Sequence, residues 1–132
     1  MHRDNCPCGS GKPYGECCAP LHQRKTVAST AEALMRSRYC AYVLGDAKYL
    51  YRSWDEATRP ALQSLRSMPP IQWVGLEIVR VEKGGEEDQV GLVEFVARYL
   101  QEGQMRLMQE SSRFRRAGGR WVYVDAAQPR EL

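Results

Sequence analysis

Apolar residues recur every three or four positions between residues 31 and 43, and this period predicts an amphipathic helix. The apolar positions are Ala31, Leu34, Met35, Tyr39, Tyr42 and Val43. Ser29-Thr30-Ala31-Glu32 has the form of a capping box, so we expect the helix to begin there. Gly45 can adopt the left-handed conformation of the residue that ends many helices. The pattern therefore predicts one helix from Ser29 to Gly45.

Two shorter helices are expected after the first. Asp46 can cap a helix whose apolar face carries Ala47, Leu50, Tyr51 and Trp54. The segment 58–68, with Leu62 and Leu65 as apolar positions, predicts the third helix. Pro69-Pro70 ends it, because the residue before a proline is pushed out of the helical region.

The apolar period changes from helical to alternating after residue 71, and alternation predicts strands. Turns that contain glycine are expected at 83–85, 101–103 and 117–119. The apolar strand positions are Val74, Leu76, Ile78, Val93, Phe95, Ala97, Tyr99, Met105, Leu107, Phe114 and Trp121 to Val124. Four strands with short turns form an antiparallel meander. Helices followed by a strongly curved antiparallel sheet predict an α+β fold with the helices segregated on one face.

Four of the five cysteines lie within thirteen residues, ahead of the first predicted helix. Cys6 and Cys8 are one residue apart, Cys17 and Cys18 are adjacent, and a glycine-containing loop joins the two pairs. Four thiolates in so compact a set suit tetrahedral Zn²⁺. Four protein ligands leave no open position, so such a zinc is structural and does not activate water.

Other roles for these thiols stay open. Adjacent cysteines bridge each other only with strain and the cysteine count is odd, which argues against disulfides. Thiol redox chemistry or zinc storage at Cys17-Cys18 is a third reading. His22 is close to the motif, but a complete tetrahedron leaves it no place as a ligand. Cys40 lies inside the first helix and is expected to act as a small, partly buried hydrophobe.

The formal net charge of +3 treats the cysteines as neutral thiols. Four thiolates and one Zn²⁺ would lower it to about +1. This balance gives no reason to expect nucleic acid as a partner. We expect Arg113, Arg115, Arg116 and Arg120 to form a solvated sheet edge. No apolar run approaches the ~20 residues that span a bilayer, and Met1-His2-Arg3-Asp4 is no signal peptide, so a cytoplasmic protein is expected.

The cysteine-rich stretch resembles the SEC-C motif, the zinc-binding tail of the bacterial preprotein-translocation ATPase SecA. It reads Cys6-Pro7-Cys8-Gly9-Ser10-Gly11-Lys12-Pro13-Tyr14-Gly15-Glu16-Cys17-Cys18. The resemblance implies one structural zinc held by Cys6, Cys8, Cys17 and Cys18, the last at a position that many relatives fill with His. In the ATPase the motif contacts a chaperone and the ribosome. A protein partner from the export or translation machinery is therefore expected.

The whole chain is similar to the YchJ family of bacterial proteins. The match is carried by Leu34-Met35-Arg36-Ser37-Arg38-Tyr39-Cys40-Ala41-Tyr42, Trp54, Trp73-Val74-Gly75-Leu76, Val93-Glu94-Phe95-Val96-Ala97-Arg98-Tyr99, Glu110-Ser111-Ser112-Arg113-Phe114 and Gly119-Arg120-Trp121-Val122-Tyr123-Val124-Asp125. The resemblance implies a nuclear-transport-factor-two-like cone, also called cystatin-like. We expect a zinc motif with its connector at 1–25 and the α+β domain at 26–132, as a monomer or homodimer.

Two functions are compatible with these features. The first is an interaction or adaptor module whose zinc knuckle docks on a protein. The alternative is a small-molecule or enzymatic pocket in the cone, built from Arg36, Tyr39, Tyr42, Glu94, Glu110 and Asp125. A plainer explanation makes these residues core and rim, with the glutamates paired to arginines such as Arg36 or Arg98. The only histidines, His2 and His22, lie outside the expected domain, so an enzyme is the less expected reading.

Overall fold

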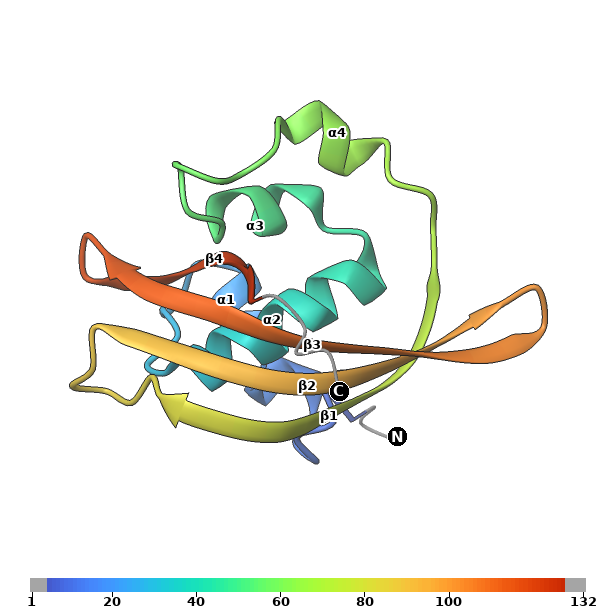
Figure 1. Cartoon of the computed structure of the whole chain (residues 1–132), viewed down its shortest axis with the longest axis horizontal. Helices are drawn as coiled ribbons and strands as arrows, with labels where there is room; N and C mark the ends of the chain where they lie inside the picture. Colours follow the sequence, from blue (N-terminus) through green and yellow to red (C-terminus); the bar gives the residue numbers. More distant parts are fainter. Residues whose placement is uncertain (1–4, 128–132) are drawn as a thin grey trace.

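A computed structural model describes residues 5–127 and shows helices gathered over one face of a long curved sheet (Figure 1). The elements are η1 (Tyr14–Glu16), α1 (Ala19–His22), α2 (Ala31–Leu44), α3 (Ala47–Arg52), α4 (Leu62–Arg66), β1 (Gln72–Lys83), β2 (Val90–Gln101), β3 (Gln104–Ala117) and β4 (Arg120–Ala127). The strand order is β1-β2-β3-β4, with antiparallel pairing throughout. The expected α+β meander is confirmed.

Helix α2 begins one residue later than the capping box predicts. Thr30 is extended, with φ −137° and ψ 161°, and its Oγ1 accepts a hydrogen bond from the Ala33 amide at 3.0 Å. Thr30 is therefore the cap, and the assignment of Ser29 is wrong. At the other end Gly45 takes the left-handed conformation as predicted, with φ 72°. Asp46 caps α3 as predicted, because its side chain accepts from the Tyr49 amide.

Helix α4 is much shorter than the predicted segment 58–68. Pro60 restricts Arg59 to extended conformations, so a helix cannot run through this point. Thr58 is held elsewhere, since its hydroxyl donates to the Val124 carbonyl at 2.7 Å. The helical turn therefore starts only at Leu62.

The sheet curves because its register is interrupted. Shifts in pairing occur between Trp73 and Gly75, between Ile78 and Arg80, and between Arg113 and Phe114. An extra residue in one strand bends that strand and increases its twist. The first shift breaks the predicted alternation of Val74 with Leu76 and Ile78, because it turns Val74 to the outer face, where it is 43% exposed.

One large core joins the helices, the sheet and the cysteine motif. Its members include Leu34, Met35, Tyr39 and Cys40 of α2, Val93, Phe95 and Ala97 of β2, Phe114, Trp121, and Cys6, Cys8 and Cys18. The cysteines are thus packed against α2 within the same hydrophobic cluster. The expected division of the chain at residue 25 stays a prediction.

Arg113, Arg115 and Arg116 do not lie at a sheet edge, because β3 is an interior strand, whereas Arg120 is exposed on the edge strand β4. Arg113 makes two hydrogen bonds to Asp125 at 2.6 and 2.9 Å. Arg115 pairs with the nearly buried Asp55. Arg116 donates to backbone carbonyls of the β1–β2 turn. Each of these side chains therefore fastens one element to another.

Among the residues that the structure describes, no helix has the length and apolar character needed to cross a membrane.

Candidate metal centre

The cysteine motif folds through two glycine-dependent turns. Gly9 and Gly11 have φ of 81° and 85°, a region that other residues rarely adopt. The Cys6 amide donates to the Lys12 carbonyl at 2.8 Å, and the Gly9 amide donates to the Cys6 carbonyl at 3.1 Å. These bonds close the loop that carries the first two cysteines. The helical turn η1 then leads directly into the adjacent cysteines Cys17 and Cys18.

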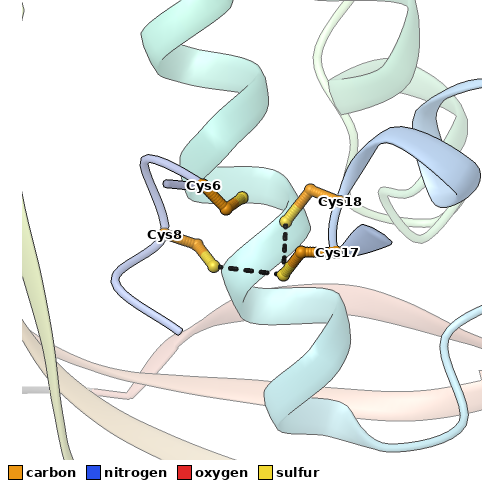
Figure 2. Close-up of side chains that lie close together, drawn as sticks. All are labelled: Cys6, Cys8, Cys17 and Cys18. Atoms are coloured by element: carbon orange, nitrogen blue, oxygen red, sulfur yellow. Dashed lines mark hydrogen bonds between the residues drawn. The ribbon is translucent and has the colours of Figure 1, made fainter. Parts of the chain in front are cut away.

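The four sulfur atoms converge on one point, as Figure 2 shows. All four Sγ atoms lie within 4.8 Å of one another. The Sγ atoms of Cys8 and Cys17 are 3.6 Å apart, and those of Cys17 and Cys18 are 3.9 Å apart. Sulfurs at ~2.3 Å from a tetrahedral Zn²⁺ are separated by ~3.8 Å. The observed spacing therefore fits a metal of this size.

The surroundings of these sulfurs also suit a closed metal site. Cys6, Cys8 and Cys18 are at most 3% exposed, and Cys17 is half-buried. All five cysteines of the chain are free thiols, so the disulfide reading is wrong for this structure. Four soft sulfur donors with little access to water can hold a metal ion and leave no open position for a substrate.

The metal-free thiols hold their protons unevenly. Burial is the main cause that raises the pKa of Cys6 to about 12. A hydrogen bond from Cys18 is the main cause that lowers the pKa of Cys8 to about 4, and Ser10 adds to the effect. Metal ligands are thiolates, so binding releases the remaining protons. Metal affinity at this site must therefore fall as the pH falls.

Arg36 of α2 holds the cysteine loop by a hydrogen bond to its backbone. Its Nη1 donates to the Cys8 carbonyl at 2.8 Å, and its Nε donates to Glu32 at 2.9 Å. Ser10 Oγ lies 3.1 Å from the Cys17 sulfur. Arg36 was expected in a ligand pocket of the cone, but the structure places it beside the metal motif.

Cys40 is a fifth thiol at the cluster, and the sequence reading missed this contact. It has no exposed surface, and its Sγ lies 3.7 Å from that of Cys6. The sequence held no signal for it, because Cys6 and Cys40 are 34 residues apart and meet only in the folded chain. Cys40 is buried as predicted, but it is buried against the sulfur of Cys6, one of the four candidate metal ligands.

His22 is engaged away from the four sulfurs. The Tyr14 hydroxyl lies 2.7 Å from Nδ1, and Nε2 lies 2.9 Å from the Ser37 carbonyl. A carbonyl only accepts, so Nε2 carries the proton and Nδ1 accepts from Tyr14. His22 therefore links the motif to α2.

The other expected pocket residues do not converge on one cavity. On the outer face Glu94 pairs with Arg80 and Asp125 with Arg113. Arg36 and Arg98, the arginines suggested for the glutamates, pair instead with Glu32 and Glu77.

The expected pocket residues on the inner face are packed side chains. Tyr39 is 4% exposed and lies edge-on to Trp73, with ring centres 6.1 Å apart. Tyr42 contacts the same ring. Glu110 accepts a hydrogen bond from its neighbour Ser112 at 2.9 Å. These residues contribute to the packing of the cone.

Arg38 is a buried cation on α2. It is 3% exposed and lies between the rings of Trp54 and Tyr123, 4.7 and 4.6 Å from their centres. Its Nη1 donates to the Leu50 carbonyl and to Ser53 Oγ. Burial lowers the pKa of Arg38. Helix α2 is joined in this way to α3 and β4.

Comparisons with known proteins agree with this architecture. The family described as "YchJ, middle NTF2-like domain" matches residues 30–126, and the SEC-C motif matches residues 3–20. A UPF0225 protein of Streptomyces coelicolor is 48% identical over 91% of this chain and 92% of its own. One of Chromobacterium violaceum is 47% identical over 92% and 91%. The solution structure of a SEC-C motif-containing protein from Rhodopseudomonas palustris superimposes with a TM-score of 0.86 at 36% identity, covering 96% of this chain and all of that one.

Proposed function

Because this chain belongs to the UPF0225 (YchJ) family and carries its SEC-C motif on an NTF2-like domain, we propose that it is a zinc-held protein-interaction module. In this proposal the knuckle of residues 6–18 contacts a cytoplasmic partner, an export chaperone or the ribosome. The observation that carries the proposal is that the Sγ atoms of four cysteines, three of them buried, lie within 4.8 Å of one another, as the ligands of one metal ion would.

Zinc is the metal that this donor set favours. Four cysteine thiolates in a tetrahedron are typical of structural zinc, which needs no redox chemistry and no open position. A knuckle of thirteen residues has no core of its own, so the metal supplies much of the free energy that orders it. Cys6, Cys8, Cys17 and Cys18 are the proposed ligands of one zinc per chain.

The way the knuckle is seated supports a role in presenting a surface. Its back is fixed to α2 by the core cysteines and by the bond from Arg36 to the Cys8 carbonyl. Its front carries exposed residues between the two cysteine pairs, among them Gly11 and Lys12. A groove of about 450 Å³, lined by Lys12, Glu32 and other side chains, separates this front from the start of α2. A partner would therefore meet a rigid, charged surface.

Binding to purified partners tests the proposal. The full chain, loaded with zinc, is assayed against ribosomes by cosedimentation and against a purified export chaperone by calorimetry. We expect one of them to bind, and we expect Lys12→Glu to weaken binding because it reverses a charge on the exposed loop without touching a sulfur. Cys17→Ser combined with Cys18→Ser should abolish binding.

Arg106→Gln is the matched control, because Arg106 is exposed on β3 at the far end of the β2–β3 hairpin. It should bind like the wild type. The proposed partners would be ruled out if the wild type bound neither of them. The role of the knuckle would be ruled out if the cysteine variant bound as tightly as the wild type.

The alternative function, a ligand pocket built on Arg36, Tyr39, Tyr42, Glu94, Glu110 and Asp125, receives no support from their placement. They are divided among the metal motif, the packed inner face and the outer face of the sheet. The interaction module is therefore the function that the geometry supports best.

A further inference from the structure

A cavity of about 400 Å³ lies on the side of the molecule where the connector after α1, the end of α3 and the start of β4 meet. Three of its lining residues are arginines, one from each of these segments: Arg24, Arg52 and Arg120. The lining contains no aspartate or glutamate. Three positive charges therefore surround one cavity. The formal net charge of the whole chain is also +3.

These arginines are not neutralised by neighbouring carboxylates. Within residues 5–127, no carboxylate lies within 4 Å of the guanidinium nitrogens of Arg24, Arg52 or Arg120. Several other arginines of the described chain do have carboxylate partners, for example Arg113 with Asp125. The cavity is therefore a place where positive charge is left uncompensated.

Two of the three side chains are held in place by the backbone. Arg52 stacks on Tyr49 at 4.6 Å, and its Nη2 donates to the carbonyls of Leu21 and His22. Arg120 Nη1 donates to the Arg52 carbonyl at 2.8 Å. In the described part of the chain no acceptor is found for the other guanidinium nitrogens of these residues. The three guanidinium groups therefore keep N–H donors that a ligand could use. The side chains of Arg52 and Arg120 are already held in position before a ligand binds.

The electrostatics of Arg52 report the same excess of positive charge. Burial is the main cause that lowers its pKa, and the nearby Arg24 and Arg120 lower it further, while Tyr49 and Asp46 act in the opposite direction. A guanidinium that neighbouring cations disfavour is one that an anion would stabilise.

Most of the remaining cavity wall is apolar or aromatic, and Thr26 and Ser53 are its uncharged polar side chains. Trp121 and Tyr49 line it, together with Val27, which is 63% exposed although most valines are buried. A wall of this kind, combined with a few fixed polar donors, is typical of small-molecule sites, and 400 Å³ lies within their usual size.

We propose that this cavity binds a phosphate monoester with a flat apolar body. The phosphate dianion meets the guanidinium groups of Arg24, Arg52 and Arg120, which match phosphate oxygens through charge-assisted hydrogen bonds. The apolar body lies against Val27 and the half-buried Leu21, which line the cavity. This site is separate from the four cysteines, so it does not depend on the interaction proposed for the knuckle.

The test is a two-dimensional ¹H–¹⁵N NMR titration of the full, metal-loaded chain with phenyl phosphate. The Trp121 indole N–H and the amides of residues 24–28 are the expected reporters, because they border the cavity. We expect saturable shifts at these positions. Arg24→Gln and Arg120→Gln should each weaken binding on the order of tenfold, the effect of one lost hydrogen bond to a charged group. Both side chains are exposed, so the variants should fold.

Three controls decide the outcome. Arg106→Gln, remote on the hairpin, should leave the affinity unchanged. Inorganic phosphate should bind more weakly than phenyl phosphate, because it lacks the apolar body, and benzoate should bind more weakly because it carries one charge. The proposal is overturned if phenyl phosphate gives no saturable shift, if Arg106→Gln weakens it as much as the cavity variants do, or if either simpler probe binds as tightly.

Discussion

Cys40 is a single side chain whose position changes the description of the metal centre. Its sulfur touches that of Cys6 from inside the core, and it has no exposed surface. Once Cys6 is a metal-bound thiolate, the Cys40 thiol can donate a hydrogen bond to it. Donors of this kind orient metal ligands, and their removal lowers metal affinity by roughly 10–100-fold.

We therefore predict that Cys40→Ala lowers zinc affinity by about tenfold, whereas Cys40→Ser, which keeps a donor of similar size, retains most of it. Competition with a chromophoric chelator measures both. Equal affinities for the wild type and the alanine variant would show that Cys40 only fills space.

Arg38 is the second residue whose surroundings decide its role. Its guanidinium lies between two aromatic rings and donates hydrogen bonds to the Leu50 carbonyl and to Ser53 Oγ. Arg38→Met keeps much of the volume but removes these two hydrogen bonds and the contacts of the cation with both rings, so we expect a loss in unfolding free energy on the order of 2 kcal/mol. Urea unfolding measures it. Arg106→Met is the exposed control and should stay within about 0.5 kcal/mol of the wild type; equal losses for the two variants would refute the assignment.

At the scale of elements, Asp55 fastens the segment after α3 to the sheet. Its amide donates to the Tyr123 carbonyl at 2.8 Å, and its carboxylate accepts from Arg115 and from the Ala57 amide. The hydrogen bond from Arg115 is the main cause that lowers the pKa of Asp55 from 3.8 to about 2. Folding therefore favours the ionised carboxylate.

The sign of the pH effect follows from this shift. The contribution of Asp55 to stability is present above about pH 4 and is lost as the pH falls toward about 2. We predict that Asp55→Asn is less stable than the wild type at neutral pH, and that the two converge in acid. Urea midpoints across this range test it, and a difference that stayed constant down to about pH 2 would contradict the account.

The contact between α2 and the β1–β2 hairpin depends on close backbone approach. The Ala31 amide donates to the Gly84 carbonyl at 2.9 Å. A methyl group added at Gly91 would lie 2.5 Å from the Gly84 Cα and 3.1 Å from the Ala31 Cβ. There is no room for it unless the backbone moves.

We predict that Gly91→Ala lowers the free energy of unfolding by about 2 kcal/mol or more. Gly15→Ala is the control, since nothing lies within 4 Å of its added methyl group, and its stability should be unchanged or slightly higher. Thermal unfolding of both variants provides the comparison, and similar midpoints would mean that the hairpin adjusts freely.

Most elements could be predicted from apolar periodicity, and the exceptions have physical causes. The start of α4 was predicted too early. Only Pro69-Pro70 was considered, for the end of the helix, whereas Pro60 restricts where the helix can begin. The shift that turns Val74 outward depends on pairing with β2, which the pattern of β1 alone does not contain. The cysteine cluster was predictable because its residues are close in sequence. The contacts of Cys40 and Arg38 were not, since they are formed across the fold.

At the scale of the whole molecule, the cysteine motif and the sheet domain share one hydrophobic core. Cys6, Cys8 and Cys18 pack with residues of α2 and β2, and His22 and Arg36 add hydrogen bonds between the motif and its support. A metal bound here would therefore stabilise the motif in a fixed orientation on the domain. The remote β2–β3 hairpin, where Leu107 is 65% exposed, extends past the helices and has no such support (Figure 1).

The most direct test of the central claim is the mass of the native protein, purified without chelator and measured by native mass spectrometry. We predict one zinc per chain in the wild type and none in the variant that combines Cys17→Ser with Cys18→Ser. Cys40→Ser should still carry its zinc, because Cys40 lies outside the proposed ligand set. A wild-type chain that is folded and free of metal would contradict the account.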